Sequence, residues 1–191
     1  MKTLKTLAVL AAACLGGAAA QAAPVPVGTV ITGQVNGASS ALLGLDHGYA
    51  DEAGSNVTAL SDGFGDLEFL TADYAVGIDF TSSGLLQVWN NSGAAALPGT
   101  YALTFSFAGL TQPLSGFVGL DLSGISSGGV SLARLDDHRI ALTLNDLTFN
   151  DSFGSFTAQL NVAAVPEPAS GALLALGLGL LALGRTRRAA A

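Results

Sequence analysis

Two histidines with acidic neighbours are the residues of this 191-residue chain that point most directly to chemistry. His47 follows Asp46 in a turn-like stretch, and His138 follows Asp136 and Asp137 just before a strand-like stretch. A hydrolase would need a serine beside one of these pairs, and serines are so numerous that this condition excludes almost nothing. The chain has no Gly-x-Ser-x-Gly elbow and no metal-binding spacing of histidines or cysteines. We therefore predict that the protein is not an enzyme, and keep a secreted hydrolase using His47 or His138 as the last alternative.

Two groups of carboxylates have the chemistry of a calcium site. Asp62, Asp66 and Glu68 flank a glycine-containing loop, and Asp136 with Asp137 forms a second pair. Oxygen ligands on loops suit Ca²⁺. The stretch from Asp62 to Asp66 nevertheless matches neither an EF-hand loop nor a nonapeptide calcium repeat. We expect these residues to cap turns and to solubilise the domain, with no cofactor, and calcium at these five positions stays the alternative.

Trp89 is the only tryptophan. It alternates with Gln87 and is opposed by Val88, so it is expected on an outer face beside the polar turn that follows. There it would be available for stacking on a sugar ring. A lone tryptophan near a strand end more often covers the edge of a core. A carbohydrate-binding module that uses Trp89 is therefore the second functional hypothesis.

The elements that must position these residues are short strands. Apolar and polar residues alternate, which is the signature of half-buried strands, and turn residues such as Asn36-Gly37 and Pro98-Gly99 separate the segments. The segments with this pattern are Tyr101–Phe107, Tyr74–Phe80, Arg139–Leu144 and Ser155–Val162, with weaker ones at Gly28–Val35, Asp66–Leu70, Leu85–Asn90, Gly116–Leu122 and Val130–Leu135. The stretches Ala41–Leu45 and Ala94–Leu97 alone have helical character, and both are short. The pattern predicts an antiparallel β-sandwich, with a jelly roll as the nearest variant. Because the last strand runs into Val165, we expect the tail to leave from a sheet edge.

Charge excludes two classes of partner. Residues 23–165 hold 13 acidic residues and only two basic ones, Arg134 and Arg139, which gives a formal charge of −11. Such a surface repels phosphate backbones and anionic headgroups, so we expect no nucleic acid and no peripheral membrane docking through this part.

Residues 1–22 have the three parts of a secretory signal. Lys2 and Lys5 precede the apolar run Leu7–Leu15, which is too short to span a bilayer, and Ala20 and Ala22 supply the small residues of a signal peptidase site.

Two other interpretations of the first segment stay open. One is an anchor helix that is never cut, and the other is lipidation at Cys14, although the preceding alanines lack the large aliphatic residue usual there. Cleavage after Ala22 would remove Cys14, the only cysteine, and with it any thiol chemistry in the mature chain.

The chain ends with a second apolar segment. Val165, Pro166, Glu167 and Pro168 interrupt any strand or helix. Ala169–Gly184 then contains only Ala, Ser, Gly and Leu, enough for a short membrane helix of about 24 Å. The arginines that keep the end cytoplasmic are Arg185, Arg187 and Arg188. The alternative, a buried hairpin helix of the domain, does not explain three arginines directly after the run.

This order of Pro-Glu-Pro, a short Gly/Leu span and a terminal arginine cluster, paired with a signal peptide, resembles the PEP-CTERM sorting signal. The resemblance implies export in a Gram-negative bacterium, transient insertion in the inner membrane, and processing near Pro166–Pro168 by an exosortase, an integral-membrane enzyme that acts like a transpeptidase. It also implies association with exopolysaccharide and biofilm. The motif is then a substrate of another enzyme and not part of an active site.

The sequence thus predicts a signal peptide over 1–22, a β-sandwich ectodomain over 23–164 and a sorting signal over 165–191. The sorting signal comprises the motif 165–168, a transmembrane helix 169–184 and a basic tail 185–191. The preferred function is that of a non-enzymatic protein of the cell surface or extracellular matrix. Its expected partners are signal peptidase, an exosortase, the inner membrane transiently, and exopolysaccharide.

Overall fold

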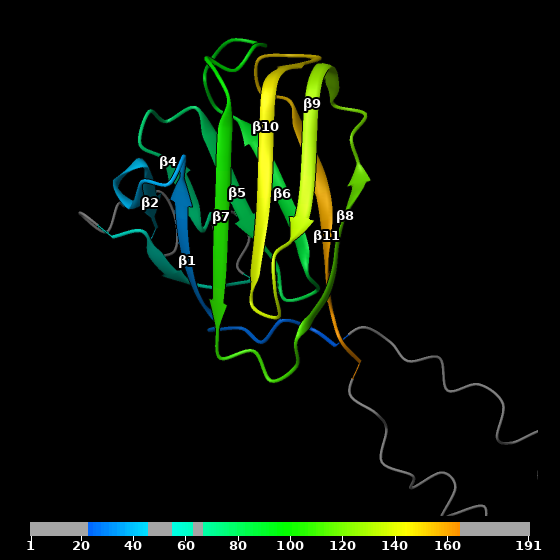
Figure 1. The fold of residues 1–191 in the computed structure, drawn as a ribbon. Helices are drawn as coiled ribbons and strands as arrows, with labels where there is room; N and C mark the ends of the chain where they lie inside the picture. The colour runs from blue at the N-terminus through cyan, green and yellow to red at the C-terminus, as the bar shows by residue number, and fades with distance from the viewer. Residues whose placement is uncertain (1–22, 46–54, 63–66, 165–191) are drawn as a thin grey trace, which may run out of the picture. The chain divides into compact units, whose positions relative to one another are not determined.

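The described part of the protein is built from strands. The computed structural model describes residues 23–45, 55–62 and 67–164, and there it has eleven strands and one turn of 3-10 helix, Ser39–Ala41 (Figure 1). The strands are β1 (Val30–Val35), β2 (Leu42–Gly44), β3 (Val57–Ala59), β4 (Phe69–Thr71), β5 (Val76–Phe80), β6 (Leu85–Asn90), β7 (Tyr101–Ala108), β8 (Leu114–Asp121), β9 (Ile125–Arg134), β10 (Arg139–Phe149) and β11 (Ser155–Val162).

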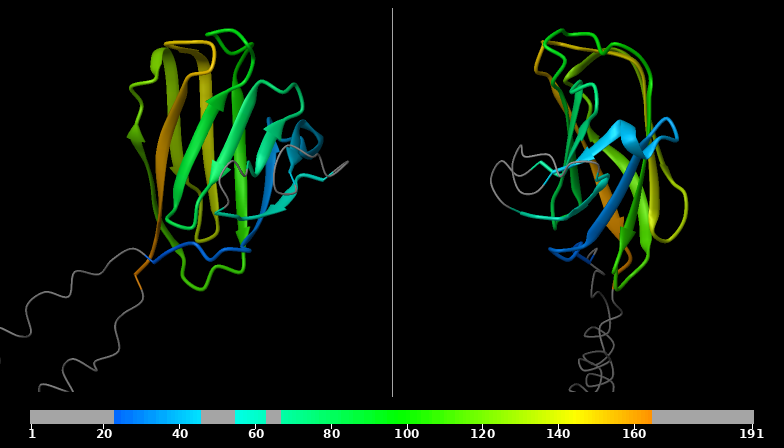
Figure 2. Two further views of the ribbon diagram at one scale, coloured as in Figure 1. Left: turned by 180° about the vertical axis from the view of Figure 1, so that it is seen from behind. Right: turned by 90° about the vertical axis from the view of Figure 1, so that its left-hand side faces the viewer.

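Two antiparallel sheets face each other across one core. One sheet has the order β3-β1-β7-β10-β9, and the other has the order β2-β4-β5-β6-β11-β8. Figure 2 shows the two layers edge-on. The predicted antiparallel β-sandwich is confirmed for the described residues.

Four phenylalanines join the sheets. Phe69 and Phe80 come from the six-stranded sheet, and Phe105 and Phe107 come from the five-stranded sheet. Phe105 lies with ring centroids 5.4 Å from Phe69 and 5.1 Å from Phe80, and Phe80 lies edge-on to Phe107 at 5.4 Å. All four are buried. Tilted and edge-on rings at these distances pack favourably, so this phenylalanine cluster fixes how the layers sit on each other.

The alternation of apolar and polar residues in the sequence correctly predicts which side chains of the strands point into the core. On β7 the buried side chains are Tyr101, Leu103, Phe105 and Phe107. The inward sides of β10 and β11 follow the prediction in the same way. A period of two forces this result, since successive side chains of a strand point to opposite faces.

The helical character predicted for Ala41–Leu45 and Ala94–Leu97 is wrong, since neither stretch forms an α-helix. Residues 42–44 form β2, which pairs with β4, and a side chain at Gly44 would collide with the Val57 carbonyl. In the second stretch the buried Asn90 amide donates to the carbonyls of Ala94 and Ala95, and the Leu97 N–H donates to the Leu147 carbonyl. These tertiary contacts override the weak local propensity.

The tail does not leave from a sheet edge, which corrects the prediction. β11 lies inside its sheet, between β6 and β8. Beyond its end the Ala163 N–H donates to the Pro113 carbonyl at 2.8 Å, and Val162 bridges to Ala23. The carboxyl end of the domain is therefore paired on both sides.

The helices expected at the two ends lie outside the described residues. The signal helix belongs to residues 1–22 and the membrane helix to residues 169–184, so both stay predictions. Within the ranges that the structure describes, no helix has the length and apolar character needed to cross a membrane.

A polar contact also joins the sheets. The Tyr101 hydroxyl, on β7, donates to Asp73 Oδ2 at 2.6 Å, and Asp73 lies in the turn between β4 and β5. Asp73 Oδ1 accepts from the Thr71 hydroxyl at 2.6 Å and from the Ala75 N–H at 3.1 Å. Burial by itself raises the pKa of Asp73, but these hydrogen bonds outweigh burial and lower it below its ordinary value.

We expect Tyr101→Phe to lower the free energy of unfolding by about 1 kcal/mol at neutral pH, because the hydrogen bond from the largely buried Tyr101 side chain to the Asp73 carboxylate is lost. Since the pKa of Asp73 is depressed, its contribution is present above its unfolded pKa and is lost as the pH falls through the folded value. The difference between the two proteins should therefore shrink in acid. Urea unfolding at several pH values measures both, with Tyr74→Phe as the control at an exposed tyrosine. Equal stability of wild type and Tyr101→Phe at neutral pH would contradict the linkage.

Candidate functional site

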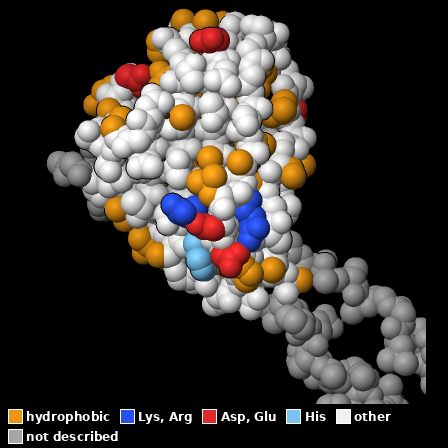
Figure 3. Space-filling view, in the orientation of Figure 1, with side chains coloured by type: hydrophobic (Ala, Val, Ile, Leu, Met, Phe, Trp, Pro, Cys, Tyr) orange, Lys and Arg blue, Asp and Glu red, His pale blue; other side chains and the backbone are white. Residues whose placement is uncertain are grey.

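The hairpin between β9 and β10 gathers all the positive charge of residues 23–165. Arg134 pairs with Asp137, and Arg139 pairs with Asp136 at 2.6 Å. Figure 3 shows these side chains in one small area with His138. The His138 N–H and the Arg139 guanidinium lower the pKa of Asp136 below its ordinary value. Each arginine is thus neutralised by its own aspartate, and these exposed pairs contribute little stability.

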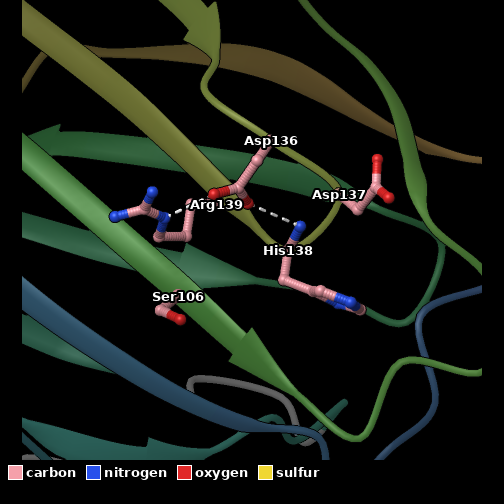
Figure 4. Close-up of a pocket in the computed structure, with 5 residues that line it drawn as sticks. All are labelled: Ser106, Asp136, Asp137, His138 and Arg139. Carbon is pink, nitrogen blue, oxygen red and sulfur yellow. Dashed lines mark hydrogen bonds and ion pairs between the residues drawn. The ribbon is translucent and has the colours of Figure 1, made fainter.

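A shallow depression on this hairpin is lined by Ser106, Asp136, Asp137, His138 and Arg139. In Figure 4 the imidazole of His138 extends away from Ser106, and the Asp136 carboxylate points toward Arg139. The described contacts of Asp136 and Asp137 thus run to arginines and to a backbone N–H. The depression does not bring serine, histidine and aspartate into the order that acyl transfer needs. His47 lies outside the described residues.

A buried glutamate, Glu68, faces a half-buried aspartate, Asp79, where β4 and β5 pair. Phe69 faces Ile78 in the register, which sets Glu68 opposite Asp79. Glu68 is only 2% exposed, and its carboxyl accepts from the Ser61 N–H at 3.1 Å and from the Phe80 N–H at 2.7 Å. Its remaining partner is the Asp79 carboxyl. Burial, reinforced by that hydrogen bond, raises the pKa of Glu68 to about 9, so this side chain is protonated at neutral pH.

The structure separates the carboxylates expected to bind calcium. Asp62 Oδ1 accepts from the Ser82 N–H at 2.6 Å. Hydrogen bonds from the Ser82 hydroxyl and from this N–H lower the pKa of Asp62. Glu68 faces Asp79 instead, and Asp66 lies outside the described residues. Asp136 and Asp137 are held by arginines. Among the described residues no group of three or more His, Cys, Asp or Glu side chains has a metal-binding arrangement.

Trp89 lies on the outer face of the six-stranded sheet, as the alternation predicts. It faces Gly77 and Ser155 in the register, and a side chain built at Gly77 would contact the indole ring. The ring packs on a small second cluster of Leu45, Leu67 and Leu70. Trp89 therefore covers a local core, as a tryptophan commonly does over a strand glycine. Its stacking on a sugar stays a prediction.

The sequence reasoning missed Asp79, the partner of Glu68. The signal that would have found it is the hairpin formed by the two neighbouring strand-like stretches, because antiparallel pairing places one acidic residue across from another. Asp73 and Tyr101 had no such signal, since 28 residues separate them.

Replacing Glu68 by glutamine should remove a pH dependence of stability. The folded-state pKa is raised, so the folded protein holds a proton that the unfolded chain has lost, and stability falls as the pH rises from the unfolded value toward 9. We expect Glu68→Gln to be more stable than wild type at pH 8 by at least about 1 kcal/mol, with a smaller decline between pH 5 and pH 8. Chemical unfolding across this range measures it.

Asp62→Asn is the matched control for that experiment, because the pKa of Asp62 is lowered and its loss acts in the opposite direction. Parallel pH profiles of Glu68→Gln and wild type would refute a protonated Glu68.

We expect calcium to leave the thermal stability unchanged, because the described carboxylates of both proposed groups already have partners. A ligand that binds the folded state raises the melting temperature, so melts in chelator, in millimolar calcium and in millimolar magnesium test this directly. A rise of several degrees with calcium alone would restore the calcium hypothesis at these carboxylates.

Comparison with known proteins bears on the end of the chain. A family model, the PEP-CTERM protein-sorting motif, matches residues 164–188, which begin at the last described residue. No curated protein and no solved structure matches the chain. The predicted sorting signal is confirmed, while Val165–Pro168 and the arginine tail lie outside the described residues. This chain carries a PEP-CTERM protein-sorting motif directly after the last strand of an all-β domain.

Proposed function

We propose that the protein is a non-enzymatic component of the cell surface or extracellular matrix, delivered by export and exosortase processing, with a structural or adhesive role in a polysaccharide layer. The observation that carries the proposal is the sorting motif at residues 164–188. Such a motif implies an exported protein that an exosortase processes and that is transiently anchored in the membrane.

The arrangement of the domain's two ends supports this route. Ala23 and Val162 bridge each other, so the chain enters and leaves the sandwich at neighbouring points, at the lower end in Figure 1. An export signal before Ala23 and a sorting signal after Ala164 therefore join the same end of the domain. Neither segment has to pass around the sandwich to reach the membrane.

Chain length places the cleavage motif near the domain. Four residues, 165–168, separate the last described residue from the predicted membrane span, and an extended chain of four residues covers at most about 14 Å. When the span is inserted, this end of the sandwich must lie within about that distance of the bilayer surface. An enzyme embedded in the membrane can then reach Pro-Glu-Pro without unfolding the last strand.

The domain suits a passive role outside the cell. Its formal charge of −11 keeps copies apart and solvated, and its two clusters of buried hydrophobic side chains stabilise the described fold. The described polar groups are engaged with one another, as in the Arg139–Asp136 pair and the Glu68 carboxyl. These features support a structural role over catalysis.

Replacing Pro166 and Pro168 together by alanine should block processing. In a Gram-negative host that carries an exosortase, wild-type protein recovered outside the cells should lack residues 1–22 and the tail. The double variant should keep its tail and stay with the inner membrane, because the motif read by the enzyme is lost. Intact mass and cell fractionation measure both.

Pro98→Ala, in the exposed loop between β6 and β7, is the control and should be processed like wild type. Wild-type chain found whole in the cytosol, arginine tail included, would overturn the sorting proposal.

A further inference from the structure

Two aromatic side chains stand out from the sandwich at the end opposite the tail. Tyr74 is 54% exposed and Phe153 is 69% exposed. Tyr74 lies just before β5 and Phe153 just before β11, whereas the tail follows the other end of β11. Figure 2 shows the loops at this end of the sheet. Single exposed apolar side chains are common on protein surfaces, so exposure alone does not mark a site, and what distinguishes these two rings is how their turns hold them.

The backbone of Tyr74 is held in an unfavourable conformation. Its φ is +60°, the left-handed region that a bulky aromatic residue seldom adopts. Hydrogen bonds hold the turn that contains Tyr74. The Asp73 carboxylate accepts from the hydroxyls of Thr71 and Tyr101, and the Tyr74 carbonyl accepts from the Asn91 side chain at 2.9 Å. Strain that persists in an exposed residue on a fixed turn is typical of a binding position.

Phe153 is presented by an equally fixed turn. Its N–H donates to Asp151 Oδ1 at 2.9 Å, and the Gly154 carbonyl accepts from the Asn90 N–H at 2.9 Å. Below the turn the rings of Phe149 and Phe156 stack, with centroids 6.4 Å apart. The exposed ring therefore stands on a rigid base, which lowers the entropy lost when a ligand binds.

The spacing of the two rings follows from the strand order. β5, β6 and β11 are consecutive in the sheet, and neighbouring strands lie about 4.8 Å apart, so the ends of β5 and β11 that follow Tyr74 and Phe153 are about 10 Å apart. The loop after β6, with Asn91 and Ser92, lies between them. This separation is close to the length of two linked pyranose rings.

We propose that Tyr74 and Phe153, with Asn91 between them and Asp151 beside Phe153, form a binding platform for a neutral glycan chain. The apolar faces of two sugar rings stack on the aromatic side chains, and ring hydroxyls donate to Asp151 and exchange hydrogen bonds with the amide and hydroxyl groups of the middle loop. An anionic glycan is disfavoured because the domain is strongly acidic. The platform goes beyond the proposed function, and it does not depend on processing of the tail.

Isothermal titration with neutral hexasaccharides of β-linked glucose and β-linked N-acetylglucosamine tests the platform. The full chain is used in a detergent without a sugar headgroup, so that a failure of sorting does not affect the assay. We expect at least one hexasaccharide to bind at millimolar concentration or below. Phe153→Ala should weaken binding by about three- to tenfold, the loss expected for one aromatic contact. Polygalacturonate, an anionic glycan, should bind no better than the neutral chains.

Tyr74→Asn separates binding from folding. Asparagine tolerates the left-handed conformation, so this variant should melt at the same temperature as wild type or higher while binding the hexasaccharide about three- to tenfold more weakly. Val27→Ala, at a side chain 62% exposed near the other end of the sandwich, should leave binding unchanged.

Absence of binding by the wild type to every hexasaccharide would overturn the proposal. Binding by both Tyr74→Asn and Phe153→Ala as tight as that of the wild type would overturn it too. Light scattering on the same samples provides one further outcome. If wild type forms dimers that Phe153→Ala abolishes, the two rings serve self-association, and the glycan platform is rejected.

Discussion

The contact between the two sheets through Phe69, Phe80, Phe105 and Phe107 is the constraint on which the rest of the structure depends. The chain changes sheets repeatedly along its length, so no loop can be placed until the layers are fixed against each other. Interlocking rings provide that fixation, because edge-on and tilted contacts resist sliding as well as separation. Burial of these large side chains also supplies much of the driving force for folding in a domain with few charges.

Closing the layers brings polar groups inside, and each described one finds a partner. Asn90, which is fully buried, donates to the carbonyls of Ala94 and Ala95 and accepts from Ser92, so it shapes the loop after β6 from within. Glu68 meets the same requirement by keeping its proton and facing Asp79. Because a buried polar group without a partner is costly, the buried Asn90 side chain helps to fix the loop after β6.

The sequence was sufficient for what depends on a period of two or on a short motif. The inward faces of β7, β10 and β11, the outer position of Trp89 and the sorting tail all follow from local pattern. The strands β2 and β3 were missed because three residues are too few to show alternation. The Glu68–Asp79 pair follows from the hairpin register, which the sequence reasoning did not work out, whereas the Asp73–Tyr101 pair depends on how the two sheets face each other and has no local signal.

The interior position of β11 connects the two ends of the domain mechanically. A strand hydrogen-bonded to β6 and β8 on either side resists a pull along its axis by shearing many bonds at once, whereas an edge strand has a single row of them. Tension applied to the tail at Ala164 is therefore carried through β11 to the turn that presents Phe153 and, across β6 and β5, to the turn that presents Tyr74. If the proposed tether and glycan platform both hold, this sheet order connects them through hydrogen-bonded strands.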